Sequence, residues 1–367
     1  YGGGIQLTTA AIDCRVDAIV PNMAWHSLET SHFQNETVKE GWASILTDIG
    51  GAHVDPHIGS AYESGITTGT LSADDKAWFI ARGPGDLVDQ ITTPTLLIQG
   101  TVDTLFPLDE ATAVYRSLRD RKVPVAMDWY CGGHGACLVD PGDTDLPGNA
   151  TTAWLARYLR ADASVDTGAR FRTVDQDGGQ WEAADLPAAD DHLTGTGKGT
   201  LALTAESTTG PIPLGDSRSG LLDGLVKDIT PGPATGPKVE VTVDAGDTDA
   251  LALGAPTLTL SYSGTTPDGA KPTRVFAQLV DPERGVVVGN QVTPVPLVLD
   301  GSPQTLEVDL ETVAQRIQPG TTLVLQLVAT TPAYAEPRLG GQVTFDRIDV
   351  DLPIVTSMAP AGGGDVR

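Results

Sequence analysis

The character of the sequence changes near residue 163, and this change limits the possible folds more than any other feature. Before it, apolar segments alternate between the period of a helix and the continuous runs of buried strands. After it, short β-branched runs are separated by Gly, Pro, Asp and Thr. The first pattern is typical of an α/β domain and the second of an all-β sandwich. We therefore expect one domain at 1–162, a second at 163–357 and a flexible tail at 358–367.

A succession of strand, helix, strand and helix ends the first domain. Residues 93–100 form an uninterrupted apolar run, which is typical of a strand buried on both faces of a parallel sheet. Residues 109–122 place apolar side chains on one helical face, 123–130 form a second apolar run, and 150–161 form a closing amphipathic helix. This order predicts a right-handed βαβ unit.

The residues before this unit predict a helix, a strand and a helical insertion. Residues 4–13 are nearly uncharged and apolar on most sides, which favours a buried helix, and residues 16–23 favour a strand. Residues 24–90 show no strand alternation and contain several glycine breaks. We interpret this stretch as a helical insertion in the α/β domain and call it the cap below.

The second domain consists of short strand candidates separated by turns. Leu323, Leu325 and Leu327 alternate with their neighbours, as residues of a sandwich strand do. Nine such runs with Pro and Gly turns predict a jelly roll. The strand candidates are 171–174, 199–204, 238–243, 256–262, 274–280, 286–288, 304–310, 321–329 and 342–350.

The charge balance excludes several classes of partner. The chain has 23 basic and 48 acidic residues, a net charge of −25, so no basic face is available for nucleic acid or for an anionic membrane surface. No uncharged apolar run reaches the roughly 18 residues that cross a bilayer. We expect a soluble bacterial protein, either secreted or cytoplasmic, and the sequence does not specify its oligomeric state.

Asp103 and His134 are the strongest candidates for catalysis. Asp103 follows the buried run 93–100, and His134 follows the next strand in a glycine-rich loop. Both positions lie just past the carboxyl ends of neighbouring parallel strands, where open α/β sheets place their active sites. A carboxylate that orients an imidazole is the acid and base pair of a serine hydrolase. The alternative is that Asp103 caps a turn and His134 is an incidental loop residue.

The expected third member of such a triad is a serine in a GxSxG turn between a strand and a buried helix, earlier in the chain than the acid and the base. The chain opens with Tyr1 and three glycines and runs into the expected buried helix. We therefore expect the serine to lie upstream of Tyr1. Four serines in the cap have no GxSxG setting and are interpreted as helix caps or surface residues, namely Ser27, Ser31, Ser44 and Ser60.

Four segments resemble the X-Pro dipeptidyl-peptidase and cocaine esterase-like hydrolases. They are YGGGIQL at 1–7, TLLIQGTVDTLFPLDEA at 95–111, WYCGGHG at 129–135 and FRTVDQDGGQWEAADLP at 171–187. The resemblance extends from Tyr1 to about Val355. It implies the C-terminal part of an α/β-hydrolase domain with a helical cap, followed by a galactose-binding-like jelly roll.

The resemblance also implies roles for single residues. Asp103 matches the triad acid, His134 the triad base, and Tyr1 the residue whose backbone N–H forms half of the oxyanion hole. The serine, the second oxyanion donor and the early strands would then precede residue 1, so we expect this chain alone to be inactive. The expected reaction is hydrolysis of an ester or amide in a small molecule or short peptide, without cofactor or metal.

Other residues are weaker candidates. Trp25, His26, Trp78 and Phe79 are candidates for a substrate pocket, although tryptophans are more often core residues. The sequence HVDPH at 53–57 offers two histidines as metal ligands, but its proline and the lack of a third ligand favour a loop.

Cys131 and Cys137 bracket His134 in the glycine-rich loop. In an oxidising compartment a disulfide between them would hold this loop rigid. Two buried thiols are the equal alternative.

Two other functions are compatible with the sequence. An X-Pro peptidase needs an acidic anchor for the free amine of its substrate, whereas an esterase needs only an apolar pocket. The cap supplies candidate anchors in Glu29, Glu36, Glu40, Asp48 and Asp55. The second alternative is a non-catalytic sugar-binding remnant, which is weakened because Trp181 is the only tryptophan of the second domain.

Overall fold

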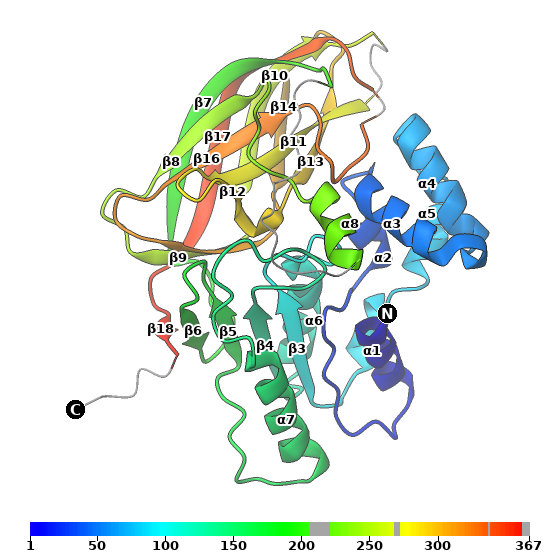
Figure 1. The fold of residues 1–367 in the computed structure, drawn as a ribbon, viewed down its shortest axis with the longest axis vertical. Helices are drawn as coiled ribbons and strands as arrows, with labels where there is room; N and C mark the ends of the chain where they lie inside the picture. Colours follow the sequence, from blue (N-terminus) through cyan, green and yellow to red (C-terminus); the bar gives the residue numbers. More distant parts are fainter. Residues whose placement is uncertain (206–220, 268–271, 337, 362–367) are drawn as a thin grey trace.

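The computed structural model describes residues 1–205, 221–267, 272–336 and 338–361. An α/β sheet, a cluster of helices beside it and a two-sheet sandwich make up the molecule (Figure 1). The expected fold class is confirmed. In the described part of the chain, no helix is long and apolar enough to cross a membrane.

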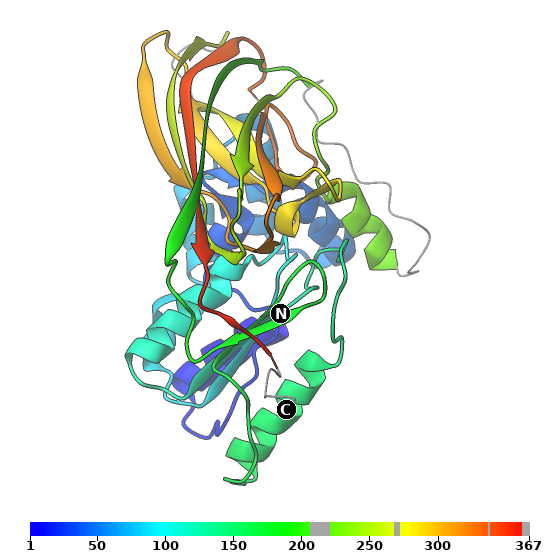
Figure 2. The same cartoon turned by 90° about the vertical axis from the view of Figure 1, so that its left-hand side faces the viewer.

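Two parallel strands form the centre of the α/β sheet. β3 (Thr95–Gly100) pairs with β4 (Val125–Tyr130), with Thr95 opposite Val125. Helix α6 (Leu108–Asp120) and helix α7 (Leu146–Leu159) cover opposite faces of the sheet (Figure 2). Leu97 packs toward α6 whereas Leu96 packs toward α7, so both faces are buried as the apolar run predicts.

The sheet extends beyond β4 by strands that the sequence analysis assigned differently. β5 (Phe171–Val174) lies parallel to β4, and β6 (Gln180–Ala183) forms a hairpin with β5. Residues 171–174 therefore belong to the α/β sheet and are not a sandwich strand. The error arises because a strand's period does not specify which sheet it joins. Further along the chain, β18 (Ala359–Pro360) pairs with β6 from within the expected tail, and residues 362–367 lie outside the described residues.

Residues 16–23 run beside β3 without forming a continuous strand. Single parallel bridges join Ile19 to Thr95 and Asn22 to Ile98. Pro21 lies between them and has no backbone N–H to donate, which explains why the expected strand is reduced to bridges.

The expected first helix is present as α1 (Gly2–Ile12), but only one of its faces is buried. Leu7 is fully buried, whereas Ile5 and Ile12 are exposed. A Cβ atom at Gly4 would lie 2.3 Å from the ring of Trp25, so only glycine permits this close contact.

Residues 24–90 are mainly helical, as expected. Ser27, Asp55 and Ser72 cap three of the helices with their side chains. The stretch contains one short hairpin between its first two helices. Its elements are α2 (Leu28–His32), β1 (Phe33–Gln34), β2 (Thr37–Val38), α3 (Glu40–Gly50), η1 (Gly51–His53), α4 (Pro56–Thr68), α5 (Ala73–Ile80) and η2 (Gly85–Gln90).

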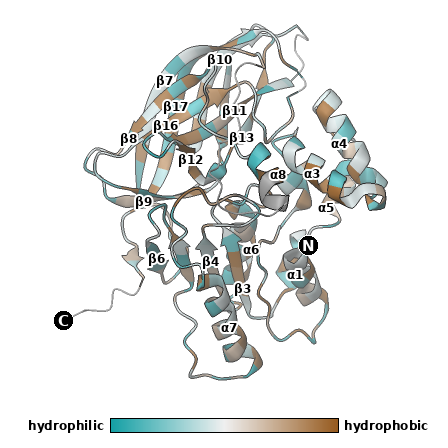
Figure 3. Ribbon diagram, viewed as in Figure 1, coloured by the Kyte–Doolittle hydropathy of each residue, from teal (hydrophilic) through white to brown (hydrophobic). Residues whose placement is uncertain are grey.

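Two antiparallel sheets form the sandwich. Apolar and polar residues alternate along several strands, so one side of each sheet faces a common core (Figure 3). One sheet consists of β7 (Asp191–Ala202), β9 (Ala250–Gly254), β10 (Thr257–Thr265), β14 (Gln304–Asp309), β15 (Val313–Ile317) and β17 (Gln342–Val355). The other consists of β8 (Val239–Asp244), β11 (Pro272–Asp281), β12 (Val286–Val287), β13 (Thr293–Val298) and β16 (Thr322–Val328).

Two short helices of the second domain reach toward the first. Helix α8 (Leu221–Ile229) packs on the cap, where Val226 and Ile229 share an apolar cluster with Trp42 and Ile45. The short helix η3 (Val288–Asn290) follows β12 and lies beside the loops after β3 and β4.

Candidate active site

Asp103 lies in the turn after β3 and is completely buried. Its Oδ1 accepts hydrogen bonds from the backbone N–H groups of Leu105 at 3.0 Å and Phe106 at 2.8 Å. Its Oδ2 lies 2.9 Å from Nδ1 of His134. One oxygen thus fixes the turn and the other is directed at the imidazole.

His134 lies in the loop after β4, and its side chain is 31% exposed. The rings of Phe106 and Trp42 pack edge to face against the imidazole, with centroid distances of 5.2 and 6.0 Å. A carboxylate at Nδ1 holds the proton on that nitrogen and leaves Nε2 as the free base. The structure therefore brings together the acid and the imidazole that the sequence predicts.

The two loops approach so closely that glycine is required between them. Gly133 has a φ of +106°, and a Cβ atom there would lie 2.6 Å from the Cβ atom of Asp103. A Cβ atom at Gly135 would lie 1.6 Å from the carbonyl oxygen of Val102. Larger residues at either position would separate His134 from Asp103.

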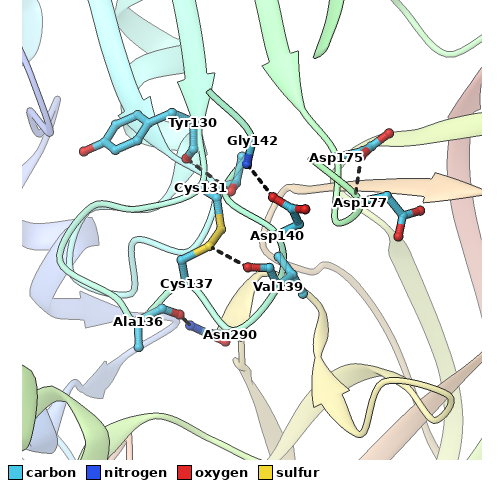
Figure 4. Close-up of a disulfide and its surroundings, with 11 residues drawn as sticks. Tyr130, Cys131, Ala136, Cys137, Val139, Asp140, Gly142, Asp175, Asp177 and Asn290 are labelled. Carbon is cyan, nitrogen blue, oxygen red and sulfur yellow. Dashed lines mark hydrogen bonds between the residues drawn. A yellow bond between two sulfur atoms is a disulfide. The ribbon is translucent and has the colours of Figure 1, made fainter. Parts of the chain in front are cut away.

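A disulfide closes the loop that carries His134. It joins Cys131 to Cys137, with 5.6 Å between their Cα atoms (Figure 4). Cys14 is a free and exposed cysteine. The loop is thus fixed at both ends by a covalent bond.

The sandwich contacts both loops through two side chains that follow one another in sequence. Asn290 donates from Nδ2 to the carbonyl oxygen of Ala136 at 2.8 Å (Figure 4). Gln291 donates from Nε2 to the carbonyl oxygen of Asp103 at 3.0 Å. The sequence analysis missed both residues, because no motif marks a contact between positions more than 150 residues apart.

Lys39 of the cap also holds the Asp103 turn. Its ammonium is buried and donates to the carbonyl oxygens of Thr104 at 3.0 Å and Leu105 at 3.2 Å. Burial lowers the pKa of Lys39. Trp42 donates from Nε1 to the hydroxyl of Thr104 at 3.0 Å, so the cap and the sandwich hold the same turn from two sides.

A cavity of about 770 Å³ opens beside His134. Its wall is formed by the cap, the turn after β3, the disulfide loop and α8. No Asp or Glu is found among the described residues that line it. The lining residues are Tyr1, Leu28, His32, Trp42, Ile45, Leu46, Ile49, Leu105, Phe106, residues 131–139, Val226 and Lys227.

The four expected pocket residues do not line this cavity. Trp25 is buried behind it, with its ring 5.1 Å from that of Phe106. Phe79 packs against His32, and Trp78 stacks on His57 at the surface of the cap. His26 lines a separate cavity of about 700 Å³ beside α6. Tryptophan and phenylalanine at these positions serve the packing of the cap.

His32 is a cavity residue that the sequence analysis missed. It ends α2, and its ring lies 5.9 Å from that of Phe79 and 6.3 Å from that of Phe106. Burial, and to a lesser degree the charge of Lys39, lowers the pKa of His32 to about 4. A lone histidine in a short helix carries no spacing from which this position is predictable.

The histidines of HVDPH belong to a different part of the cap. Asp55 caps α4, and Nδ1 of His57 lies 2.8 Å from Oδ1 of Asp75. Within the described ranges, no group of three or more His, Cys, Asp or Glu residues is arranged to hold a metal ion.

Three solved structures share this architecture. An α-amino acid ester hydrolase aligns with 97% of this chain and 75% of its own, at 12% identity and a TM-score of 0.68. A CocE/NonD family hydrolase from Staphylococcus aureus aligns with 95% of this chain and 69% of its own, at 11% identity and a TM-score of 0.59. An aminopeptidase from a marine sediment Thaumarchaeota archaeon aligns with 92% of this chain and 72% of its own, at 12% identity and a TM-score of 0.59.

These similarities are structural. No family model matches the sequence, and no curated protein matches it. At identities of 11 and 12%, the similarity shows that the fold is shared.

Proposed function

We propose that the chain carries the acid and the base of a serine hydrolase. Its substrates would be carboxylic esters that place an apolar group in the cavity beside His134. The observation that carries this proposal is the contact between buried Asp103 and His134 beside an apolar cavity. The pair lies past the carboxyl ends of two parallel strands, where α/β sheets place catalytic groups. The shared fold of known hydrolases agrees with it.

The proposed reaction has two steps. A serine upstream of Tyr1 attacks the ester carbonyl while Nε2 of His134 takes the hydroxyl proton, and the same proton then passes to the departing alkoxide. Water attacks the resulting acyl-enzyme, His134 takes its proton and returns it to the serine oxygen, and the carboxylic acid leaves. Asp103 stabilises the imidazolium in both steps. The backbone N–H of Tyr1, a residue that lines the cavity, would help to bind the oxyanion.

The cavity wall favours an ester over an X-Pro peptide. A peptidase that recognises a free N-terminus needs a carboxylate to pair with the ammonium. None of the five acidic cap residues considered as anchors lines the cavity, namely Glu29, Glu36, Glu40, Asp48 and Asp55. The described lining is mainly apolar and its charged side chain is Lys227, so it suits an uncharged substrate better than a cationic one.

The sugar-binding alternative has little support, because its candidate stacking residue, Trp181, lies in β6 of the α/β sheet and not in the sandwich. Trp181 donates from Nε1 to Asp175 at 2.8 Å, and the guanidinium of Arg316 lies 4.6 Å from its ring centroid. The ring therefore already has partners within the protein. We assign the second domain a structural role, in which Asn290 and Gln291 hold the catalytic loops.

The proposal is tested with the chain joined to its serine-bearing upstream segment. We expect a fluorophosphonate probe to label the serine and 4-nitrophenyl butyrate to be hydrolysed faster than a Gly-Pro anilide. His134→Ala should abolish labelling. His57→Ala is the matched control, because His57 also pairs with a buried aspartate but lies outside the cavity. Labelling that persists in His134→Ala would disprove the triad.

A further inference from the structure

His32 is a polar group in an otherwise apolar part of the cavity wall. It is partly buried, and its neighbours in the wall are Leu28, which precedes it in α2, and the ring of Phe106. The rings of Phe79 and Phe106 fix the imidazole from two directions. The side chain is therefore held in place before any substrate binds.

The ring nitrogens of His32 have no hydrogen-bond partner within the described residues. The backbone carbonyl oxygen of His32 accepts a hydrogen bond from the N–H of Lys39 at 3.0 Å, but this leaves the imidazole free. His57, His134 and His192 differ, since each has an aspartate oxygen at Nδ1. Because His32 lines the cavity, a ligand bound there with a matching polar group can serve as the hydrogen-bond partner that the ring lacks within the described protein.

The charge state of His32 restricts what it can bind. With a pKa of about 4, the imidazole is neutral near pH 7 and offers one N–H donor and one acceptor nitrogen. A neutral imidazole gives an anion no opposite charge, and the lysine that lines the cavity, Lys227, belongs to α8 and not to the α2 part of the wall that carries His32. An ammonium would find no carboxylate among the described lining residues. An uncharged hydroxyl or carbonyl group matches both the imidazole and its apolar surroundings.

We infer that His32 is a specificity-determining residue that hydrogen-bonds an uncharged hydroxyl or carbonyl group on the part of the ester that fills the cavity. This inference rests on the proposed esterase function and narrows its substrate class. A plain hydrocarbon chain fits the cavity but leaves the imidazole unpaired. Sites built to hydrogen-bond a substrate discriminate strongly against analogues that lack the partner group.

The kinetic test uses the protein joined to its serine-bearing segment. Ethyl butyrate is compared with ethyl 2-hydroxybutyrate, ethyl 3-hydroxybutyrate and ethyl 3-oxobutyrate. We expect kcat/KM for at least one oxygenated ester to exceed that for ethyl butyrate by about 5- to 10-fold, the value of one hydrogen bond. The ratio should fall to about 1 in His32→Phe and be partly kept in His32→Gln, which retains a donor and an acceptor.

Leu28→Ala is the matched control, because it enlarges the same wall without removing a polar group. It should change the rates of all four esters by similar factors. A preference that is absent in the wild type, or that persists unchanged in His32→Phe, would overturn the inference.

A binding measurement keeps this test separate from the esterase proposal. In the 367-residue chain labelled with ¹⁵N-histidine, the same oxygenated ester should shift the ring resonances of His32, whereas ethyl butyrate should leave them nearly unchanged. If neither ester is hydrolysed by the joined protein but the shift is seen, the esterase proposal fails and the recognition by His32 stands. If no oxygenated ester shifts the resonances, the inference fails even where hydrolysis is observed.

Discussion

The molecule contains two histidines that meet a buried aspartate at nearly the same distance. Nδ1 of His134 lies 2.9 Å from Asp103, and Nδ1 of His57 lies 2.8 Å from Asp75. The first pair stands at the carboxyl ends of parallel strands beside a large cavity. The second joins two helices of the cap at the protein surface.

The difference between the pairs lies in what surrounds them. The second oxygen of Asp75 accepts from the hydroxyls of Ser60 and Ser72, so the carboxylate ties α4 to the start of α5. His57 is 42% exposed and stacks on Trp78. His134 instead has aromatic rings at its sides and open space in front of it. The cavity beside His134, which His57 lacks, is the reason that we propose a catalytic role for the first pair and not for the second.

The largest effect is expected where the two histidines are replaced in turn. His134→Ala removes the base and should lower kcat of the serine-complete protein by a factor on the order of 10⁴ to 10⁶. His57→Ala should leave kcat within about twofold, because nothing that reacts lies near it. Hydrolysis of 4-nitrophenyl butyrate measures both. An equal loss of kcat in His134→Ala and His57→Ala would contradict the proposal that His134 alone is the base.

Replacing each aspartate by asparagine sharpens the comparison. Asp103→Asn keeps the shape but no longer fixes the imidazole tautomer, so kcat should fall by a factor on the order of 10³ to 10⁴ with little change in KM. Asp75→Asn should leave kcat nearly unchanged. The separate determination of kcat and KM in both variants checks this, and a KM effect alone in Asp103→Asn would contradict it.

Variants of the Asp75–His57 pair should lower the stability of the protein, although they leave kcat nearly unchanged. Asp75→Ala removes the acceptor for His57, Ser60 and Ser72, so the free energy of unfolding should fall by about 2–4 kcal/mol. Urea unfolding monitored by tryptophan fluorescence measures this. His57→Phe keeps the stacking on Trp78 and should cost less. A cap that tolerates Asp75→Ala without loss would show that its carboxylate does not hold the helices.

His32, which has no aspartate partner, should make stability depend on pH. Its pKa is about 4 in the folded chain against an ordinary 6.5, so the unfolded state binds more protons between these values and stability falls as pH is lowered through this range. Between pH 7.5 and 5 this loss amounts to about 2 kcal/mol. His32→Phe should lose less stability over the same range. The midpoints of urea unfolding of both proteins at the two pH values measure this difference. An equal loss of stability in the wild type and in His32→Phe would contradict the lowered pKa of His32.

The smallest effect is expected from the sandwich contact to the Asp103 turn. Gln291→Ala removes the hydrogen bond to the carbonyl oxygen of Asp103, so kcat should fall by about 10-fold while KM changes little. Gln291→Glu, with an acceptor facing that carbonyl, should be no better. The matched control is Gln315→Ala, because its side chain bonds Asp281 within the sandwich. A kcat effect of equal size in the control would show that the loss comes from general destabilisation.

The contact between Asp103 and His134 was predictable because it depends on the α/β sheet alone. Parallel strands deliver the residues after them to one edge, and both strands are marked by apolar runs. The sheet that residues 171–174 join was not predictable, because a strand of this composition fits either sheet equally well. His32, Asn290 and Gln291 were invisible to sequence reasoning, since each acts through packing between distant segments.

The pairing of β18 with β6 matters when the two domains are to be produced separately. Glu182 and Trp181 of β6 pair with Ala359 and Pro360, which follow the last strand of the sandwich. A chain cut near residue 190 would therefore lose the segment that shields this margin of the sheet, and uncovered margins of this kind invite aggregation. The chain passes from the α/β sheet to the sandwich between β6 and β7, and it returns between β17 and β18. To separate the two domains, β18 would have to be kept next to β6 or replaced by another strand.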